Sequence, residues 1–425
     1  MGSAKVVNRL VFILSVILTG AIAGFFVWLV LFVMDVGLTL VWDGLSSWFG
    51  RFYPVLMCVI GGIVIGLFAR RFGNYPEDLR TVMAKVKRDG GYDYDKLGRM
   101  SVAAVLPLVF GGSVGPEAGL TGVIAGLCTW AGQRMRRFGS DFRELTEAGV
   151  TATLSALFTA PLYGFASGMG GRTAGDSGEG STPRWVKAVV YACAIAGALA
   201  AMLLLTHYVG GGLPLPYYEW DAVGTNELVW LVPLILIGAL AGWLFCVSDA
   251  LLSRVSGRFG DRPLLKPVVA GAVLGVCGVV LPFTMFSGES QAVELDSLWT
   301  GMGAALLLVT GFVKILVTAM CVNMGWRGGH FFPTIFAGIS IGYGMALLSG
   351  ADPVFCLCTV TAALVGGVMR KPLMAVLLLF LCFPLLAAIP MALAAFVGSR
   401  IPLPSWVSEA EREMGEPESV DARRL

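Results

Sequence analysis

Charged residues are scarce in this chain. Only 14% of its 425 residues are Asp, Glu, Lys or Arg, whereas soluble domains average about 25%. The formal net charge is +2, so the chain lacks the basic excess of a nucleic-acid-binding protein. Hydrophobic residues make up 56%, which excludes intrinsic disorder. The composition therefore predicts a polytopic membrane protein.

Residues that commonly bind metals are also few. The chain has two histidines, and its nine cysteines include no CxxC pair and no Cys/His cluster. HExxH, P-loop and GxGxxG motifs are absent. The peptide GGSVG at 111–115 fits the GxSxG pattern of serine hydrolases but lacks the expected strand–turn–helix context. We expect no metal, no cofactor and no enzymatic activity.

Apolar segments run through the whole chain without the alternation of barrel strands, so the spans should be helices. The first follows Lys5 and Arg9 and is too long for a signal-peptide core, so it is expected to be an uncleaved span. The segments are 10–34, 53–69, 101–133, 147–169, 186–207, 228–253, 267–284, 303–324, 331–349 and 353–398.

Several of these segments are the wrong length for one clean crossing. The 53–69 segment is short, and glycines and Pro116 interrupt 101–133. The 353–398 segment is interrupted by RKP at 370–372 and again by Pro384 and Pro390. Broken or re-entrant helices are tolerated at membrane depth where protein surrounds them or where they line a cavity. This pattern is typical of transporters and channels.

The distribution of Lys and Arg predicts the orientation. The basic loops 70–100, 134–143, 170–187 and 254–266 are expected to be cytoplasmic, as is the N-terminus. The loops 209–227 and 285–300 contain acids but no Lys or Arg, so they are expected to be external. The short polar tail at 405–425 is expected on the cytoplasmic side.

The two halves of the chain share one order of signals. In the first, GGSVGPE at 111–117 opens a helix and APLYG at 160–164 opens another. In the second, RGGHFFP at 327–333 and KPLMA at 371–375 do the same. Proline near the first turn is a helix-start signal. Such internal symmetry is typical of secondary transporters, which bind ions near the midplane between helix ends.

The two glycine-rich starts suit an anion. A helix N-terminus carries partial positive charge and unpaired N–H donors, and glycines let the backbone approach an ion closely. Such a site binds an anion without placing a fully charged protein side chain in the bilayer. The alternative is that Gly and Pro simply allow close packing and a kink.

Four ordered peptides resemble the CLC chloride channels and transporters. GHFFP at 329–333 matches the family's GxFxP signature, and Gly115-Pro116 matches the end of its GxEGP signature. APLYG at 160–164 and RKPL at 370–373 are similar to its APLAG and RAPL segments.

The resemblance implies an all-α integral membrane fold: an inverted-repeat bundle of about eighteen tilted, partly re-entrant helices. It implies a single transmembrane domain at 1–404, with inverted halves near 10–208 and 228–404. It further implies a homodimer with one pore in each subunit.

The side chains that bind ions or carry protons in this family are replaced here. Val114 stands where the family has its gating glutamate. Gly73, within FGNYP at 72–76, stands near the family's anion-binding serine. Pro404 lies near the expected tyrosine and Gly171 near the internal proton glutamate. Backbone donors can still bind an anion, but the ion and the proton coupling do not carry over.

Glu117 is the candidate gate, because an acidic residue within a membrane-spanning segment is expected to have a functional role. Its alternative role is a partner of the helix dipole. His330 is either a hydrogen-bonded core residue or a pH-sensitive pore group. Arg327 is either a snorkelling side chain or a charge that attracts anions to the pore mouth. The candidate ion-pathway residues are Gly112, Ser113, Val114, Gly115, Pro116, Glu117, Gly329, His330, Phe331, Phe332 and Pro333.

The function predicted from the sequence is passive transport of a small inorganic anion across the cytoplasmic membrane of a prokaryote. Chloride is the first candidate for this anion. One alternative is an exchanger coupled to protons or sodium through Glu117. Another is a membrane scaffold or sensor with a closed pore.

Overall fold

The protein is described by a computed structural model that covers most of the chain. It describes residues 2–43, 50–73, 82, 85, 92–135, 142–169, 183–212, 215–220, 224–260 and 262–407. Regular structure in these ranges is helical, and the bridge between Gly115 and Gly329 is the isolated β-pairing found there. An all-α fold is therefore confirmed.

Within the described residues, the first half of the chain forms seven α-helices, and the predicted Gly and Pro positions separate α5 from α6 and α7 from α8. The helices are α1 (Gly2–Leu38, continued by a π-helical turn at Thr39–Asp43), α3 (Tyr53–Phe72), α5 (Leu97–Val109), α6 (Glu117–Met135), α7 (Phe142–Leu157), α8 (Pro161–Met169) and α9 (Arg184–Val209).

The second half repeats this series with one additional helix, α12, in the described part of the chain. Its helices are α10 (Thr225–Arg258), α11 (Leu265–Val280), α12 (Glu289–Leu298), α13 (Ala304–Asn323), α14 (Phe331–Ser349), α15 (Pro353–Met369), α16 (Pro372–Leu379) and α17 (Ala388–Arg400). Short 3-10 turns lie at Gly50–Phe52, Pro282–Thr284, Trp299–Gly301 and Leu385–Ala387.

Six helical segments of the described chain are long and apolar enough to cross a membrane. They are Phe12–Asp43, Gly50–Phe72, Arg184–Val209, Thr225–Arg258, Ala304–Asn323 and Phe331–Ser349. In the last, 89% of the most apolar window is buried inside the protein, so other helices surround this span. The nine residues of α8 rise about 14 Å, less than half of a hydrocarbon core of about 30 Å. The bundle therefore combines full spans with partial helices.

The predicted interruptions fall where the sequence placed them, with one correction. The 101–133 segment divides into α5 and α6, and 147–169 contains the break before Pro161. The 353–398 segment divides after Met369 and again at 380–387. Pro390 does not interrupt a helix: it lies in the first turn of α17, where its missing N–H removes no helical hydrogen bond. The ten-residue α12, inside the loop 285–300, was not predicted.

The two halves pack their helices in the same order. In the first half α6 packs on α7, and α7 packs on α1, α8 and α9. In the second, α14 packs on α15, and α15 packs on α10, α16 and α17. The shared sequence cadence therefore corresponds to a shared arrangement of helices.

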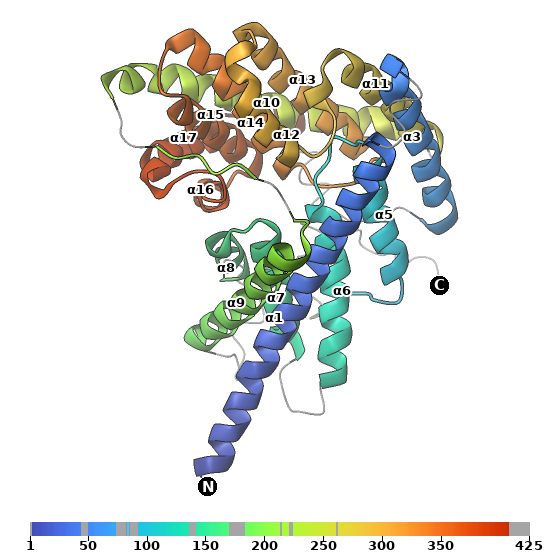
Figure 1. Cartoon of the computed structure of the whole chain (residues 1–425), viewed down its shortest axis with the longest axis vertical. Coiled ribbons are helices and arrows are strands. Elements are labelled where there is room, and N and C mark those ends of the chain that lie inside the picture. Colours follow the sequence, from blue (N-terminus) through green and yellow to red (C-terminus); the bar gives the residue numbers. More distant parts are fainter. Residues whose placement is uncertain are drawn as a thin grey trace.

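Equivalent elements of the two halves meet each other. Figure 1 shows α3 beside α11, and α8 just below α16. The helices α3 and α11 are each the second of their half, and α8 and α16 are each the last but one. The loops joined by the bridge between Gly115 and Gly329 also correspond, since each precedes the helix that packs on α7 or α15. That bridge is antiparallel. Such pairings are expected along a pseudo-two-fold axis, as in an inverted repeat.

Small residues bring the helices close together. A Cβ at Gly24 on α1 would lie 2.2 Å from the carbonyl oxygen of Ala198 on α9. A Cβ at Gly338 on α14 would lie 2.6 Å from Oγ1 of Thr361 on α15. Close backbone approach of this kind is how membrane helices associate, since burial of apolar surface provides no drive within lipid.

Candidate functional site

The glycine-rich loops before α6 and α14 join at the centre of the protein. The backbone N of Gly115 donates to the carbonyl of Gly329 at 2.8 Å, and the N of Gly329 donates back to Gly115 at 2.7 Å. Both helices begin two residues beyond this bridge. The structure therefore brings together the two helix starts expected from the sequence, whose partial positive charges both favour an anion.

Glu117 reaches from one helix start to the other. It is the first residue of α6, and only 1% of its surface is exposed. Its Oε1 accepts a hydrogen bond from the backbone N–H of Phe331, the first residue of α14, at 2.7 Å. Oε2 is buried without a hydrogen-bond partner among the described residues. The carboxylate therefore occupies the N-terminal end of α14, where the helix dipole favours negative charge.

Glycines form the space that holds this carboxylate. A Cβ at Gly115 would lie 2.0 Å from Oε2 of Glu117. A Cβ at Gly329 would lie 1.8 Å from Cδ of the same side chain. Any other residue at either position would displace the carboxylate or the loop, so the Gly-rich signals and Glu117 form one structural unit.

The rest of the first loop is fully buried. Ser113 Oγ lies 2.9 Å from Oγ1 of Thr318 on α13. Val114 is 0% exposed, and a Cβ added at Gly328 would lie 2.7 Å from the Cβ of Val114. Gly112 N donates to the carbonyl of Pro107 at 2.8 Å. Val114 therefore fills a packed space and supplies no charge.

The second loop is lined by aromatic rings. Phe331 and Phe332 lie 6.0 and 5.2 Å, centroid to centroid, from Phe158 at the end of α7. The imidazole of His330 packs between Phe245, at 5.3 Å, and Phe331, at 4.7 Å. His330 is half-buried, next to the helix start that Glu117 caps. Pro116 and Pro333 lie at the helix starts, as predicted.

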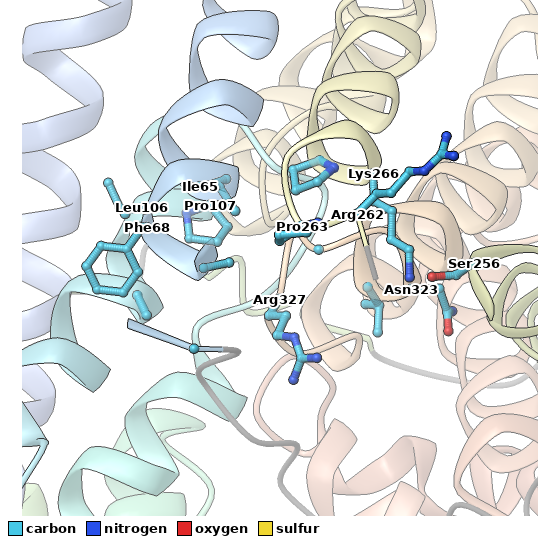
Figure 2. Close-up of a pocket in the computed structure, with 16 residues that line it drawn as sticks. Ile65, Phe68, Leu106, Pro107, Ser256, Arg262, Pro263, Lys266, Asn323 and Arg327 are labelled. Carbon is cyan, nitrogen blue, oxygen red and sulfur yellow. The ribbon is translucent and has the colours of Figure 1, made fainter. Parts of the chain in front are cut away.

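Arg327 lines a basic pocket of about 120 Å³ rather than the helix-start site itself. Figure 2 shows Arg327 between the apolar side chains of Phe68, Ile65 and Leu106 and a second group that comprises Arg262, Lys266, Ser256 and Asn323. Arg262 and Lys266 belong to the basic segment 254–266, which the sequence predicts to be cytoplasmic. Three cations around one pocket raise the local concentration of anions.

Two buried charged residues were missed in the analysis of the sequence. Lys314 in α13 is 0% exposed, and Glu289 at the start of α12 is 3% exposed. Lys314 is the one charged residue within the apolar segment 303–324, and this signal was sufficient to identify it as a candidate functional residue. Glu289 carried no such signal because its helix was not predicted.

Some predicted positions lie outside the described residues. These are Asn74, Tyr75, Pro76 and Gly171, together with residues 408–425 of the tail. Gly73 ends α3 with φ of 95°, a conformation that favours glycine, and it lines the basic pocket. Pro404 precedes a short helical turn, where its carbonyl accepts from Val407 N at 2.9 Å.

Comparison with known proteins agrees with this architecture. The family described as "Voltage gated chloride channel" matches residues 61–402. Chloride channel protein CLC-e of Arabidopsis thaliana is 26% identical over 406 residues, covering 83% of this chain and 55% of the relative. The chain thus spans about half the length of that protein. The putative ion-transport protein YfeO of Salmonella newport is 26% identical over 326 residues, covering 75% of this chain and 74% of the relative.

Solved structures share the fold. A slow cyanobacterial Cl⁻/H⁺ antiporter superposes with a TM-score of 0.72 at 18% identity, covering 95% of this chain and 98% of the other. A CLC-type fluoride/proton antiporter gives a TM-score of 0.72 at 16% identity, covering 91% and 94%. With its matched region extending over most of its length, this multi-pass membrane chain belongs to the voltage-gated chloride channel (CLC) family.

Proposed function

We propose that this protein moves a small inorganic anion, with chloride as the first candidate, between the helix starts of α6 and α14, and that Glu117 gates this passage. The observation that carries the proposal is the hydrogen bond from Phe331 N–H to the Glu117 carboxylate. A carboxylate resembles an anion bound at a helix N-terminus, so the same donors can bind a permeant anion when Glu117 moves away.

The basic pocket supplies the second support. Arg327, Arg262 and Lys266 face a space bounded by the ends of α3 and α13 and the start of α11. Their charge attracts anions without binding one in the apolar core. In this proposal the pocket is the cytoplasmic mouth, and both described termini lie on the cytoplasmic side of a prokaryotic cell membrane.

Passive movement is the first form of this proposal. The family resemblance assigns Val114 to the position of the gating acid; this side chain is fully buried, lies against Gly328 and carries no ionisable group. A liposome flux assay tests this directly. Purified protein is reconstituted, and efflux of chloride, fluoride, nitrate and bicarbonate is measured with and without a pH gradient. Selective anion flux that neither pumps protons nor responds to the proton gradient supports the passive form.

Exchange coupled to protons or sodium through Glu117 is the second form. The buried Oε2 without a described hydrogen-bond partner favours it, because a protonated carboxyl tolerates burial better than an ion. The similar structures named as Cl⁻/H⁺ and F⁻/H⁺ antiporters add weight. Proton uptake driven by an anion gradient would establish this form, whereas the absence of flux for every ion would favour a scaffold or sensor.

The homodimer implied by the family resemblance is also part of the proposal. The short helices α8 and α16 pack together, one from each half, and both present exposed leucines, Leu162 and Leu373. Neither helix is long enough to span the bilayer alone, so a partner subunit would complete this surface. Cross-linking in native membranes, compared with a Leu162→Trp/Leu373→Trp variant, measures whether two copies associate here.

A further inference from the structure

A second pocket, here called the surface pocket, lies beside the basic pocket. It has a volume of about 600 Å³ and lies between the C-terminal half of α3 and the segment that leads into α11. Its two cations are Arg70 and Arg262, and its apolar walls come from Ile63, Leu264, Leu265 and Val268. No acidic side chain from the described part of the chain lines this space. The surface pocket therefore combines two positive charges with an apolar wall.

Close contact between α3 and α11 produces this shape. A Cβ at Gly62 would lie 2.4 Å from the carbonyl oxygen of Pro267, so the two backbones meet there. Larger side chains on either side of this contact form the walls, and Ile63 and Leu265 remain 40% and 38% exposed. The segment Gly50–Phe72 is long and apolar enough to cross a membrane, so its exposed apolar side chains face acyl chains.

The exposed apolar side chains of α3 follow one face of the helix and end at Arg70. Leu56, Ile60, Ile63 and Leu67 are exposed at successive spacings of four, three and four residues. Arg70 follows three residues later and is exposed as well, so it continues the same face. The helix rises about 15 Å from Ile60 to Arg70, which is half of a hydrocarbon core of about 30 Å. The apolar stripe thus matches the depth of one membrane leaflet and ends at a cation.

The two arginines of the surface pocket lie at the same end of the helix pair. A Cβ at Gly275 would lie 2.5 Å from Cα of Val55, near the start of α3. A Cβ at Gly66, near the end of α3, would lie 2.8 Å from Cα of Leu264, just before α11. The helices therefore run antiparallel, which places both arginines at one membrane boundary.

The charge and shape of the surface pocket fit an anionic phospholipid. A guanidinium binds a phosphate through two parallel N–H···O bonds, and the cytoplasmic face of a membrane carries anionic lipid. The basic segments 70–100 and 254–266, which contain the two arginines, are predicted to lie on that side. A free inorganic anion would leave the apolar wall without a partner. A zwitterionic lipid would bring an ammonium group that the arginines repel.

We propose that one anionic phospholipid binds in the surface pocket, with its phosphate on Arg70 and Arg262 and an acyl chain along the apolar stripe of α3. Figure 2 shows the guanidinium of Arg262 directed away from Arg327, so the phosphate lies apart from that cation of the basic pocket. Figure 1 shows α3 and α11 at one edge of the molecule, apart from α8 and α16. A lipid bound here therefore leaves the proposed dimer surface free.

Native mass spectrometry of the purified full-length protein tests this. The protein in detergent is titrated with phosphatidylglycerol and with phosphatidylcholine of the same acyl chains, and we expect one phosphatidylglycerol to be retained in preference. An arginine near the membrane surface contributes about fivefold to such binding, equivalent to about 1 kcal/mol. Arg70→Gln combined with Arg262→Gln should therefore weaken phosphatidylglycerol binding by more than about tenfold and leave phosphatidylcholine binding unchanged.

A matched variant controls for net charge. Arg184→Gln combined with Arg258→Gln removes the same charge at two exposed positions that line neither pocket, and it should leave phosphatidylglycerol binding unchanged. Equal affinity of the wild type for the two lipids would overturn the proposal, as would equal weakening in this control.

A change of shape separates a lipid site from a simple anion site. Ile63→Trp fills the space between the helices without altering charge and should largely remove phosphatidylglycerol binding. Leu236→Trp makes the same kind of change at an exposed apolar position of α10 and should not. Excess inorganic phosphate should compete weakly, because it cannot use the apolar wall. Full displacement by phosphate, or unchanged binding in Ile63→Trp, would refute a lipid site. Since no flux is measured, failure of the proposed transport leaves this result standing.

Discussion

Glu117 caps the helix that begins at Phe331: its Oε1 lies 2.7 Å from the Phe331 backbone nitrogen, so an acid of the first half binds the helix start of the second. The sequence separation is 214 residues. A helix N-terminus has few donors, and one carboxylate uses those that a free anion would need. In the proposed passage the anion therefore competes with Glu117 for these donors.

Replacement of Glu117 by Gln tests that competition. The amide keeps the shape of the side chain but removes its negative charge, so an anion meets less opposition at the helix starts. We expect anion flux to rise several-fold and to lose its pH dependence. Flux is measured in liposomes between about pH 4 and about pH 8, which brackets a carboxyl group and an upward shift by burial.

Other results for Glu117→Gln assign other roles. A well-folded variant with unchanged flux across this range would leave Glu117 as a helix-dipole partner, worth at most about 1 kcal/mol of stability. A well-folded variant that transports nothing would show that the carboxylate is needed, which favours proton carriage or cation binding.

The glycine beside this carboxylate gives a second prediction. In Gly329→Ala the new Cβ would lie 1.8 Å from Cδ of Glu117, so the side chain must leave the helix start or the loop must shift. We expect the variant to resemble Glu117→Gln in its raised flux, with a lowered melting temperature. Both are measured on the same reconstituted sample.

Two variants separate this effect from general damage. Gly303→Ala places a Cβ in open space at the N-cap of α13 and should change neither flux nor melting temperature. Glu117→Ala combined with Gly329→Ala removes the side chain that the new Cβ meets, so part of the lost stability should return. If the double variant is no more stable than Gly329→Ala, the collision is not with Glu117.

The sequence was sufficient to predict the helix starts. Gly and Pro act locally: a proline fits the first turn, and a glycine allows two backbones to meet, so the starts of α6, α8, α14 and α16 could be predicted from neighbouring residues. The predicted interruption at Pro390 was wrong. Proline interrupts a helix only when it lies beyond the first turn, and the sequence did not show that α17 begins at Ala388.

The charged cluster around the start of α14 could not be found in this way. Glu289 lies in a loop that is acidic and polar, and nothing local shows that its side chain turns inward. Its burial depends on Gly288 packing against Phe336, a contact between residues far apart in sequence. Lys314 was detectable, since it is the single charge of an apolar span, but its partners were not.

The contact between α1 and α9 gives a prediction about stability. A Cβ at Gly24 would lie 2.2 Å from the carbonyl oxygen of Ala198, a backbone atom that cannot rotate away. We expect Gly24→Ala to destabilise the protein by about 1–3 kcal/mol, the usual cost of overpacking. Thermal unfolding in detergent measures this. Gly98→Ala, a helical glycine of α5 with nothing within 4 Å, should be neutral or slightly stabilising; equal losses in both variants would contradict close packing as the cause.

The basic pocket gives the last prediction. An attraction of about 1 kcal/mol for a unit charge at 4 Å in water corresponds to a roughly fivefold local enrichment of anions. Arg327→Gln should therefore slow anion entry from the pocket side by up to about fivefold at low salt, and by much less near 1 M salt, where the screening length falls to about 3 Å. Flux is measured in oriented vesicles at both salt concentrations. Arg258→Gln makes the same charge change at an exposed position that does not line the pocket, and it should have a smaller effect. A loss that is equal at both salt concentrations would mean that Arg327 supports the loop before α14 rather than attracting the ion.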